Sequence, residues 1–405
     1  MVNQRLWGLT LLERNLRELH KLAFKEVVVL TTEEIDPSKH FSHPLPKTLE
    51  FSLVIANESD PFESLRSNLQ KSNELMLVLE GHALNDRRVL KQLIYANSVI
   101  GVISPSGSNK AGAAILSHCE ASLFEKNSSG KLTSILLAAI QNSKMANLNL
   151  SNFQTYVKPL RREIVPFLLL VEQPEHLKEA DQILRQTVHK GVNDFVAKYI
   201  HPPLEFGAVR YLADTPVTPN QITIFWMVLA GFTIPLFATG HLLLGIILAA
   251  LCGVLDGIDG KLARLTLRFS KAGDLLDHAS NTVYDATWYL ALGWYFSEGD
   301  LNSTAARLTL VLFISYCVER IVPGVFEKLH GQEIYDYEKL DKLARLAGSR
   351  MNNNVWLLMI GIILGFARQA FYFISLWMLT TASWHIVRLL WVTWKAKAKK
   401  PVFTN

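Results

Sequence analysis

Three aspartates lie in the most apolar part of this chain, at spacings that could build a site for a charged ligand. The stretch reads Asp256-Gly-Ile-Asp259-Gly260-Lys-Leu-Ala263-Arg264 and, eight residues later, Gly273-Asp-Leu-Leu-Asp277-His-Ala-Ser-Asn281. Carboxylates are costly in a membrane and usually mark a site where they occur there. Asp256 and Asp259 share one helix face, as do Asp277 and Asn281, because their spacings are i,i+3 and i,i+4. Two helices that present oxygen ligands to each other predict a divalent-cation site.

Composition divides the chain into two regimes around this stretch. A mean hydropathy of +0.18 and 49% hydrophobic residues are high for a wholly soluble protein of 405 residues. The first 200 or so residues are charged and mixed, whereas the long apolar runs that begin at Thr218 are typical of a polytopic membrane domain. We therefore predict an α/β domain at 1–180, amphipathic juxtamembrane helices at 181–217 and a membrane domain at 218–396.

Charge and cysteine content exclude some functions. The net charge of +5 is small for this length, and no basic face with interleaved aromatic residues is visible, so we expect no nucleic-acid partner. The three cysteines are far apart in the chain, which is typical of small buried side chains in a reducing compartment. Residues 1–17 are polar and amphipathic rather than leader-like, so the first half is expected to stay in the cytoplasm.

Helix and strand signals alternate through the first half. Short apolar runs typical of buried parallel strands occur at 26–31, 53–56, 75–79 and 99–103. Helical patterns occur at 11–24, 61–70 and 86–95, and a mixed segment with helical character occupies 111–124. This alternation predicts a three-layer α/β domain with a mostly parallel sheet.

The first half also resembles sugar-nucleotidyltransferase domains. The segments that carry the resemblance are Leu11–His20 with Glu26–Val29, the strand Leu75–Gly81, and Gly112–Leu116. No glycine-rich phosphate loop precedes the first helix, and Gly81-His82 stands where that family has Gly-Asp with a metal-binding Asp. We interpret the domain as degenerate and non-catalytic. The alternatives are a domain that makes the CDP-alcohol for the membrane half and a generic α/β fold.

The junction before the first apolar run is amphipathic. Residues 180–200 predict a helix with one apolar side, His201-Pro-Pro203 breaks it, and 204–213 resumes the pattern. Such a helix lies along the membrane interface or packs on the membrane domain as a connection. Thr218 then predicts a helix N-cap, with Pro219 in the first position.

The second half predicts an all-α domain of six transmembrane helices. The candidate spans are 220–239, 241–264, 272–297, 303–325, 352–367 and 369–394. Lysine and arginine gather between spans two and three, between spans four and five, and in the C-terminal tail. The positive-inside rule therefore predicts an integral protein of a cytoplasmic or inner membrane, with both termini and the aspartate motif on the cytoplasmic side.

The aspartate motif is similar to the signature of CDP-alcohol phosphotransferases. Those six-helix membrane enzymes transfer a phosphoalcohol from a CDP-linked donor to an alcohol acceptor and release CMP. Seven of the eight signature positions match: Asp256, Asp259, Gly260, Ala263, Arg264, Gly273 and Asp277. The resemblance covers about 185–395 and implies a CDP-alcohol donor, an alcohol acceptor, a lipid bilayer and a phospholipid or related phosphodiester product. A homodimer stays an open option.

The resemblance assigns roles to these residues. Asp256, Asp259 and Asp277 would hold Mg²⁺ or Mn²⁺ against the donor pyrophosphate. The residues expected around the nucleotide are Asp256, Gly260, Ala263, Arg264 and Gly273, where small side chains allow close approach and the arginine donates to phosphate or cytidine. Arg320 and Arg350 are candidate acceptor contacts because the family's acceptor pocket lies near them, and snorkelling toward the interface is their ordinary alternative role.

Asn281 occupies the eighth position, where the family has an aspartate proposed as the base that deprotonates the acceptor. An amide can ligate a metal through its oxygen, but it cannot accept a proton at neutral pH. Asp285, one turn further on, or His278 could supply the base, which places Asp277, Asn281 and Asp285 in the predicted catalytic set. The alternatives are a variant with weak activity and a catalytically impaired membrane scaffold or sensor that binds a CDP-alcohol.

Overall fold

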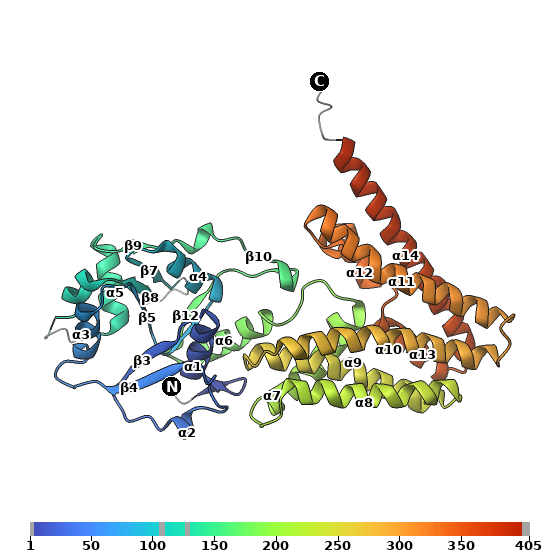
Figure 1. Ribbon diagram of the computed structural model, residues 1–405, viewed down its shortest axis with the longest axis horizontal. Helices are drawn as coiled ribbons and strands as arrows, with labels where there is room; N and C mark the ends of the chain where they lie inside the picture. The colour runs from blue at the N-terminus through green and yellow to red at the C-terminus, as the bar shows by residue number, and fades with distance from the viewer. Residues whose placement is uncertain (1–3, 105–109, 126–129, 399–405) are drawn as a thin grey trace.

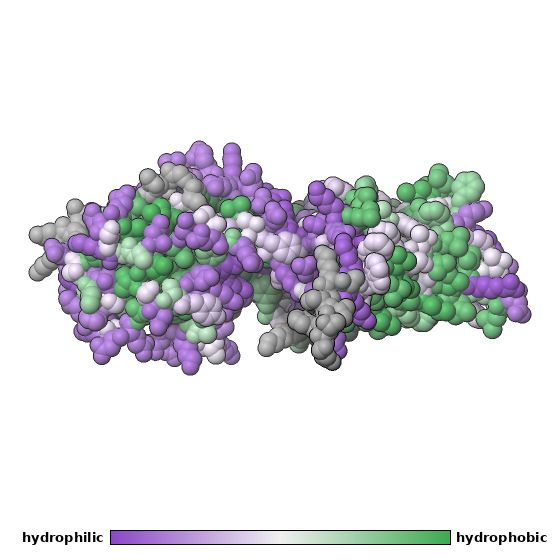
Figure 2. Space-filling view, turned by 90° about the horizontal axis from the view of Figure 1, so that it is seen from above, coloured by the Kyte–Doolittle hydropathy of each residue, from purple (hydrophilic) through white to green (hydrophobic). Residues whose placement is uncertain are grey.

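The computed structural model describes residues 4–104, 110–125 and 130–398, and Figure 1 shows them in two parts. An α/β domain holds the N-terminal residues, and a helical domain holds the residues from about 195 onward. Figure 2 shows apolar surface gathered over the helical domain, whereas the surface of the α/β domain is mostly hydrophilic.

The α/β domain contains short strands and mostly short helices. Its strands are β1 Arg5–Leu6, β2 Leu9–Thr10, β3 Glu26–Thr31, β4 Glu50–Ile55, β5 Met76–Leu79, β6 Ala83–Asn85, β7 Ile100–Ile103, β8 Ala111–Leu116, β9 Ala146–Asn147, β10 Tyr156–Val157, β11 Arg162–Glu163 and β12 Leu168–Leu170. Its helices are α1 Leu11–Lys21, α2 Pro37–His40, α3 Glu63–Lys71, α4 Arg87–Ala96, α5 Leu132–Gln141, α6 Pro174–Gln186 and the 3-10 turns η1 His118–Leu123, η2 Leu150–Asn152 and η3 Lys158–Leu160.

The strands form several small sheets, so the prediction of a mostly parallel sheet is wrong. β3 and β4 pair in parallel, but the largest sheet has the order β5-β8-β7-β9, and β8 runs antiparallel to both of its neighbours. Three further pairs are antiparallel as well: β1 with β2, β12 with β6, and β10 with β11.

Strand β8 explains part of this error. The sequence predicted helical character at 111–124, but the segment is a fully buried strand followed by a 3-10 turn. Alternate residues of β8 enter two different cores, with Ala114 and Leu116 in one and Ala113 and Ile115 in the other. A strand buried on both faces is continuously apolar, so its sequence lacks the period that distinguishes a strand from a helix.

The junction also differs from its prediction. Helix α6 ends at Gln186, and the following residues 187–194 are irregular, so a helix across 180–200 is not formed. A π-helical turn, η4 Val196–Ile200, then runs directly into α7 His201–Leu212, where a break was predicted. Pro202 and Pro203 fit there because they occupy the first turn of α7, where a missing N–H is tolerated, and the wider π turn precedes them.

The helical domain follows the predicted spans closely. Its elements are α8 Pro219–Ala238, α9 Leu242–Leu265, α10 Lys271–Ser297, α11 Thr304–His330, the 3-10 turn η5 Ile334–Asp336, α12 Lys339–Ala347, α13 Met351–Ile363 and α14 Ala367–Ala398. Thr218 caps α8 as predicted, since its hydroxyl accepts from the Gln221 amide and the Gln221 side chain accepts from the Thr218 amide. A core that includes Trp226, Phe237 and Trp288 packs between the helices.

Length and composition identify four helices of the described residues that could cross a bilayer: α8, α9, α11 and α14. The predicted third and fifth spans correspond to α10 and α13, which do not meet the same criterion. α10 carries Asp274, Asp277, His278 and Asp285. The 13 residues of α13 reach about 20 Å, less than the roughly 30 Å of a bilayer core. The six-span count is therefore not confirmed.

Candidate active site

A cavity of about 400 Å³ lies where α7, α8, α9, α10 and the start of α13 meet, beside the irregular segment 187–194. Every residue that the sequence singled out as a site residue lines it: Asp256, Asp259, Gly260, Ala263, Arg264, Gly273, Asp277, Asn281, Asp285, Arg320 and Arg350. The structure therefore brings the motif helices and the two candidate acceptor arginines into one space.

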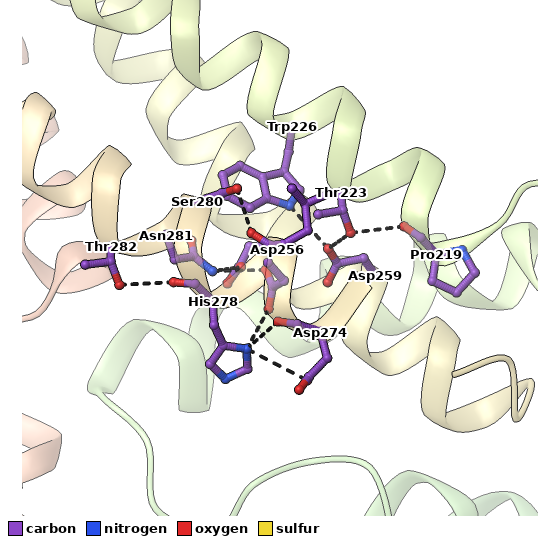
Figure 3. Close-up of polar contacts among 12 residues, drawn as sticks. Pro219, Thr223, Trp226, Asp256, Asp259, Asp274, His278, Ser280, Asn281 and Thr282 are labelled. Atoms are coloured by element: carbon purple, nitrogen blue, oxygen red, sulfur yellow. Dashed lines mark hydrogen bonds and ion pairs between the residues drawn. The ribbon is translucent and has the colours of Figure 1, made fainter. Parts of the chain in front are cut away.

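Asp259 is the most enclosed of the three motif aspartates. Its carboxylate oxygen Oδ2 accepts a hydrogen bond of 2.6 Å from the Thr223 hydroxyl and one of 3.2 Å from the Trp226 indole (Figure 3). Both donors belong to α8, which packs along α9. These two bonds satisfy a carboxylate that is 4% exposed, and they fix its direction before any ligand binds.

Asn281 joins the other two aspartates. Its side-chain nitrogen donates to Asp256 Oδ1 at 2.7 Å and to Asp277 Oδ1 at 3.0 Å. Asp277 lies one turn before Asn281 on α10. Asp256 approaches Asn281 from α9 (Figure 3). The amide can be oriented from these contacts, because two carboxylate oxygens require the donor nitrogen between them. We call Asp256, Asp277 and Asn281 the carboxylate wall.

The carboxylate wall has the chemistry of a divalent-cation site, since Mg²⁺ and Mn²⁺ prefer carboxylate and amide oxygens. Two carboxylates converge on one point, and the amide nitrogen of Asn281 now lies between them. Among the described residues, however, no three His, Cys, Asp or Glu side chains are arranged to hold a metal ion. Asp259 is directed toward Thr223 and Trp226, so the predicted three-aspartate ligand set stays a prediction.

Two glycines of the motif allow helices to approach closely. A Cβ atom on Gly273 would lie 2.2 Å from Asn220 Oδ1, and one on Gly257 would lie 1.7 Å from Glu205 Oε1. The sequence predicted close approach at Gly273 but did not single out Gly257. At Gly260 a Cβ would meet the guanidinium of Arg264 at 3.1 Å, so glycine there leaves room for that side chain beside the cavity.

The two candidate bases have different surroundings. His278 is largely exposed, and its Nδ1 lies 2.9 Å from the Asp274 carbonyl oxygen and 3.8 Å from Asp277 Oδ2. Asp285 instead accepts from Arg320 Nη2 at 2.6 Å. Arg320 also donates from Nε to the Tyr316 hydroxyl at 2.8 Å. The structure thus pairs a predicted base with a predicted acceptor contact.

A cationic wall, which we define as Lys190, Arg345 and Arg350, lines the same cavity. Arg350 Nη1 lies 3.9 Å from Glu319 Oε2, whereas the Nε and Nη1 of buried Arg345 have no hydrogen-bond partner among the described residues. Burial, reinforced by nearby arginines, lowers the pKa of Lys190 to about 8, and burial lowers the pKa of Arg345 to about 10. Closely spaced cations that are partly desolvated favour an anionic ligand.

Sequence reasoning missed most of this second wall. Lys190 lies in a segment predicted as plain amphipathic helix, and Arg345 was counted among the positive loop residues that set orientation. Glu205 of α7 was also missed. It forms a buried ion pair with Lys261, with Nζ 2.6 Å from Oε2, which links α7 to the motif helix. Burial raises the pKa of Glu205, and the charge of Lys261 opposes that shift.

Comparison with known protein families identifies the helical part of the chain. Residues 216–382 match the family model of CDP-alcohol phosphatidyltransferases. The chain contains a CDP-alcohol phosphatidyltransferase domain. This confirms the family predicted from the motif, and the apolar helices together with this family indicate an integral membrane protein. The likeness of the α/β domain to nucleotidyltransferases stays a prediction.

Similar proteins cover this chain in part. A bifunctional IPC transferase and DIPP synthase from Aquifex aeolicus is 28% identical over 234 residues, which is 57% of this chain and 51% of that protein. An archaetidylinositol phosphate synthase from Pyrococcus horikoshii is 41% identical over 92 residues, 21% of this chain and 46% of that protein. The chain thus spans about half the length of these relatives. A solved phosphatidylinositol phosphate synthase from Mycobacterium tuberculosis has a TM-score of 0.36 at 16% identity, covering 47% of this chain and 93% of that one.

Proposed function

We propose that this CDP-alcohol phosphatidyltransferase domain transfers a phosphoalcohol group from a CDP-linked donor to the hydroxyl of an acceptor and releases CMP. The observation that carries the proposal is one cavity that holds the whole motif together with the cationic wall. A donor pyrophosphate and an acceptor hydroxyl could meet there between the carboxylate wall and the cationic wall.

The carboxylate wall would hold the donor. A bound Mg²⁺ or Mn²⁺ would neutralise charge on the pyrophosphate. Asp256 and Asp277 would be its ligands with Asp259, and the Asn281 amide would have to turn its oxygen inward or move aside. Arg264, which lies over Gly260, would donate to a phosphate or to the cytosine ring. Gly260, Ala263 and Gly273 would leave space for the nucleotide.

The proton acceptor would come from a residue other than Asn281. Asp285 and His278 remain the two candidates. His278 offers its Nε2 if the proton stays on Nδ1, which faces the Asp274 carbonyl oxygen. Asp285 would have to act while paired with Arg320.

The acceptor would be a phosphorylated alcohol. Lys190, Arg345 and Arg350 supply the positive charge that such a group needs, and two Arg345 nitrogens have no hydrogen-bond partner within the part of the chain that the structure describes. The Pyrococcus horikoshii relative is named for archaetidylinositol phosphate, so an inositol phosphate is the first acceptor to test.

The decisive experiment measures CMP release by the purified full chain in lipid nanodiscs with Mg²⁺ or Mn²⁺. The donors are CDP-diacylglycerol and CDP-inositol, and the acceptors are inositol, inositol 1-phosphate, glycerol and glycerol 3-phosphate. We expect CMP release with a phosphorylated acceptor and none after the metal is chelated. If no donor and acceptor pair releases CMP, the transferase proposal fails.

A second candidate function is a catalytically impaired CDP-alcohol-binding scaffold or sensor. The Asn281 amide favours it, because its nitrogen donates to both Asp256 and Asp277 and an amide cannot serve as a base. Tight, metal-dependent CDP binding without CMP release from any pair would support this candidate over the transferase.

We further propose that both termini and the cavity face the cytoplasm and that the α/β domain has no catalytic site of its own. The clusters of lysine and arginine support the orientation. His82 supports the second point, because it pairs with Glu80 at 2.9 Å where nucleotidyltransferases would have a metal-binding aspartate. Labelling of Cys119, which is exposed in the α/β domain, in sealed inside-out and right-side-out vesicles would test the orientation.

A further inference from the structure

The hairpin β10–β11 of the α/β domain reaches the helical domain. Lys158, in the turn of the hairpin, pairs with Glu327 at 3.0 Å and donates to the Gly331 carbonyl oxygen at 3.0 Å. The Tyr156 hydroxyl donates to Asp336. All three acceptors lie at the end of α11 or in the connection that follows it. The hairpin is therefore fixed to the segment that leads into α12.

The other side of the same hairpin holds the irregular segment 187–194. The Gly191 amide donates to the Leu160 carbonyl oxygen at 2.8 Å, and Arg162 Nη1 donates to the His189 carbonyl oxygen at 3.3 Å. A Cβ atom on Gly191 would lie 2.6 Å from the Arg161 carbonyl oxygen, so glycine permits this contact. The segment that is held in this way supplies Lys190 to the cavity.

Arg161 lies in the hairpin between its contacts with the connection after α11 and its contacts with segment 187–194. Its φ of +49° is in the left-handed region, an uncommon conformation for a residue with a side chain and a sign of functional constraint where the surroundings enforce it. The guanidinium pairs with Glu333 and lies 5.5 Å from the ring centre of Tyr335. The same ring lies 4.2 Å from the guanidinium of Arg345 and 5.9 Å from that of Arg350.

We propose that the hairpin of the α/β domain is a positioning element of the transferase site, with Arg161 as its central positioning residue. Arg161 orders Tyr335, whose ring supports Arg345 and Arg350. The hairpin also orders the segment that carries Lys190, through the Leu160 carbonyl, the Arg162 guanidinium and Arg161 Nη1, which donates to the Val192 carbonyl oxygen at 3.5 Å. The α/β domain thereby builds the cationic wall without contributing a side chain to it. This inference rests on the proposed function in one respect, namely that the cationic wall binds the acceptor.

The experiment compares Arg161→Gly and Arg161→Lys with the wild type in the full chain. Arg161→Gly keeps the left-handed backbone without strain and removes the guanidinium. We expect it to raise the acceptor KM by about tenfold, because small misplacement of binding groups weakens productive binding strongly. The donor KM and kcat should stay within about twofold, and Arg161→Lys should recover part of the loss through its charge.

Arg87→Ala is the matched control, because Arg87 pairs with Glu18 inside the α/β domain and its side chain is likewise not part of the cavity lining. We expect it to leave the acceptor KM unchanged. If Arg161→Gly lowers kcat and raises both KM values together, with a matching fall in Tm, Arg161 has a general structural role and the proposal is overturned. It is equally overturned if Arg161→Gly behaves as the wild type.

Hydrogen–deuterium exchange supplies a readout that needs no turnover. In Arg161→Gly, peptides that cover 186–194 and 333–347 should exchange faster than in the wild type, whereas peptides from α8 and α9 should not change. Faster exchange in a chain that releases no CMP would uphold the positioning role while the transferase proposal fails. Unchanged exchange in both segments would overturn the positioning role whatever the activity.

Discussion

The two walls of the cavity are assembled in different ways. The carboxylate wall comes from a single stretch of 26 residues that forms the end of α9 and the start of α10. The cationic wall comes from three separate segments, an irregular connection, α12 and the residue before α13. The first wall is set by helical spacing, whereas the second depends on tertiary contacts, including those of the distant hairpin β10–β11.

This difference suggests how a site can change its substrate without changing its reaction. Residues held at i,i+3 and i,i+4 spacing keep their relation wherever the helix pair is kept. Residues carried by loops can be altered or moved one at a time. We therefore expect substitutions in the carboxylate wall to affect the reaction itself, and substitutions in the cationic wall to affect the choice and affinity of the acceptor.

The largest effect is expected from Asp256→Ala. This change removes one of the two carboxylates that meet at Asn281, so kcat/KM should fall by about 10³-fold or more. CMP release at several metal concentrations would measure it. Asp214→Ala, at an exposed position outside the cavity lining, is the control and should retain wild-type activity. A loss of less than tenfold for Asp256→Ala would remove the distinction between the two walls.

Asn281→Asp should act in the opposite direction. It replaces the bridging amide with a carboxylate that can bind a metal and accept a proton, so turnover at neutral pH should rise, by about 10²-fold if the base is otherwise missing. Asn281→Ala serves as the control, because it removes the amide without adding a base. A fall in turnover for Asn281→Asp, together with complete loss for Asp285→Asn, would instead identify Asp285 as the base.

Arg345→Ala tests the cationic wall directly. Two of its nitrogens face no partner among the described residues, and a charged hydrogen bond contributes about 1.5–3 kcal/mol, so the KM of a phosphorylated acceptor should rise roughly 10- to 100-fold. The KM of an uncharged alcohol acceptor should hardly change, and Arg345→Lys should be intermediate. Equal losses for charged and uncharged acceptors would show that Arg345 supports the fold rather than the acceptor.

The smallest effect is expected from the titration of Lys190. Its pKa is lowered to about 8, so its ammonium is charged below pH 8 and becomes neutral as the pH rises through that value. The KM of a phosphorylated acceptor should therefore increase by a few-fold between pH 7 and pH 9. Lys190→Arg keeps its charge over this range and should flatten the profile. An identical profile for both proteins would exclude Lys190 from acceptor binding.

Much of the helical domain could be predicted from the sequence. The helix that begins at Pro219 was placed correctly because Thr218 is an N-cap, and α9 and α10 begin and end within one residue of their predicted bounds. The convergence of Asp256, Asp277 and Asn281 also follows from spacing and from a short connection between two helices. Helix caps, helix bounds and residue spacing are local properties, and a single sequence contains the information that determines them.

The rest depends on contacts between distant segments. β8 is apolar on both faces, and neither its strand form nor its antiparallel pairing can be read from a pattern without a period. The ion pair of Glu205 with Lys261 joins two helices, α7 and α9. Residue spacing within one helix does not predict where two helices cross. The guanidinium groups of Arg161, Arg345 and Arg350 all lie close to the ring of Tyr335, and of these four residues the sequence singled out only Arg350 as a site residue.

The length of helix α14 allows an estimate of where the cationic wall would lie relative to a bilayer. Its 32 residues extend about 48 Å, and at a typical tilt of about 20° roughly 21 of them would cross a 30 Å hydrocarbon layer. Counted from Ala367, the part that leaves the hydrocarbon begins near Arg388, which forms a two-point ion pair of 2.7 Å bonds with Asp341 of α12. Arg345 is on that same short helix. A water-soluble acceptor would therefore reach the cationic wall at the border of the bilayer, without crossing its interior.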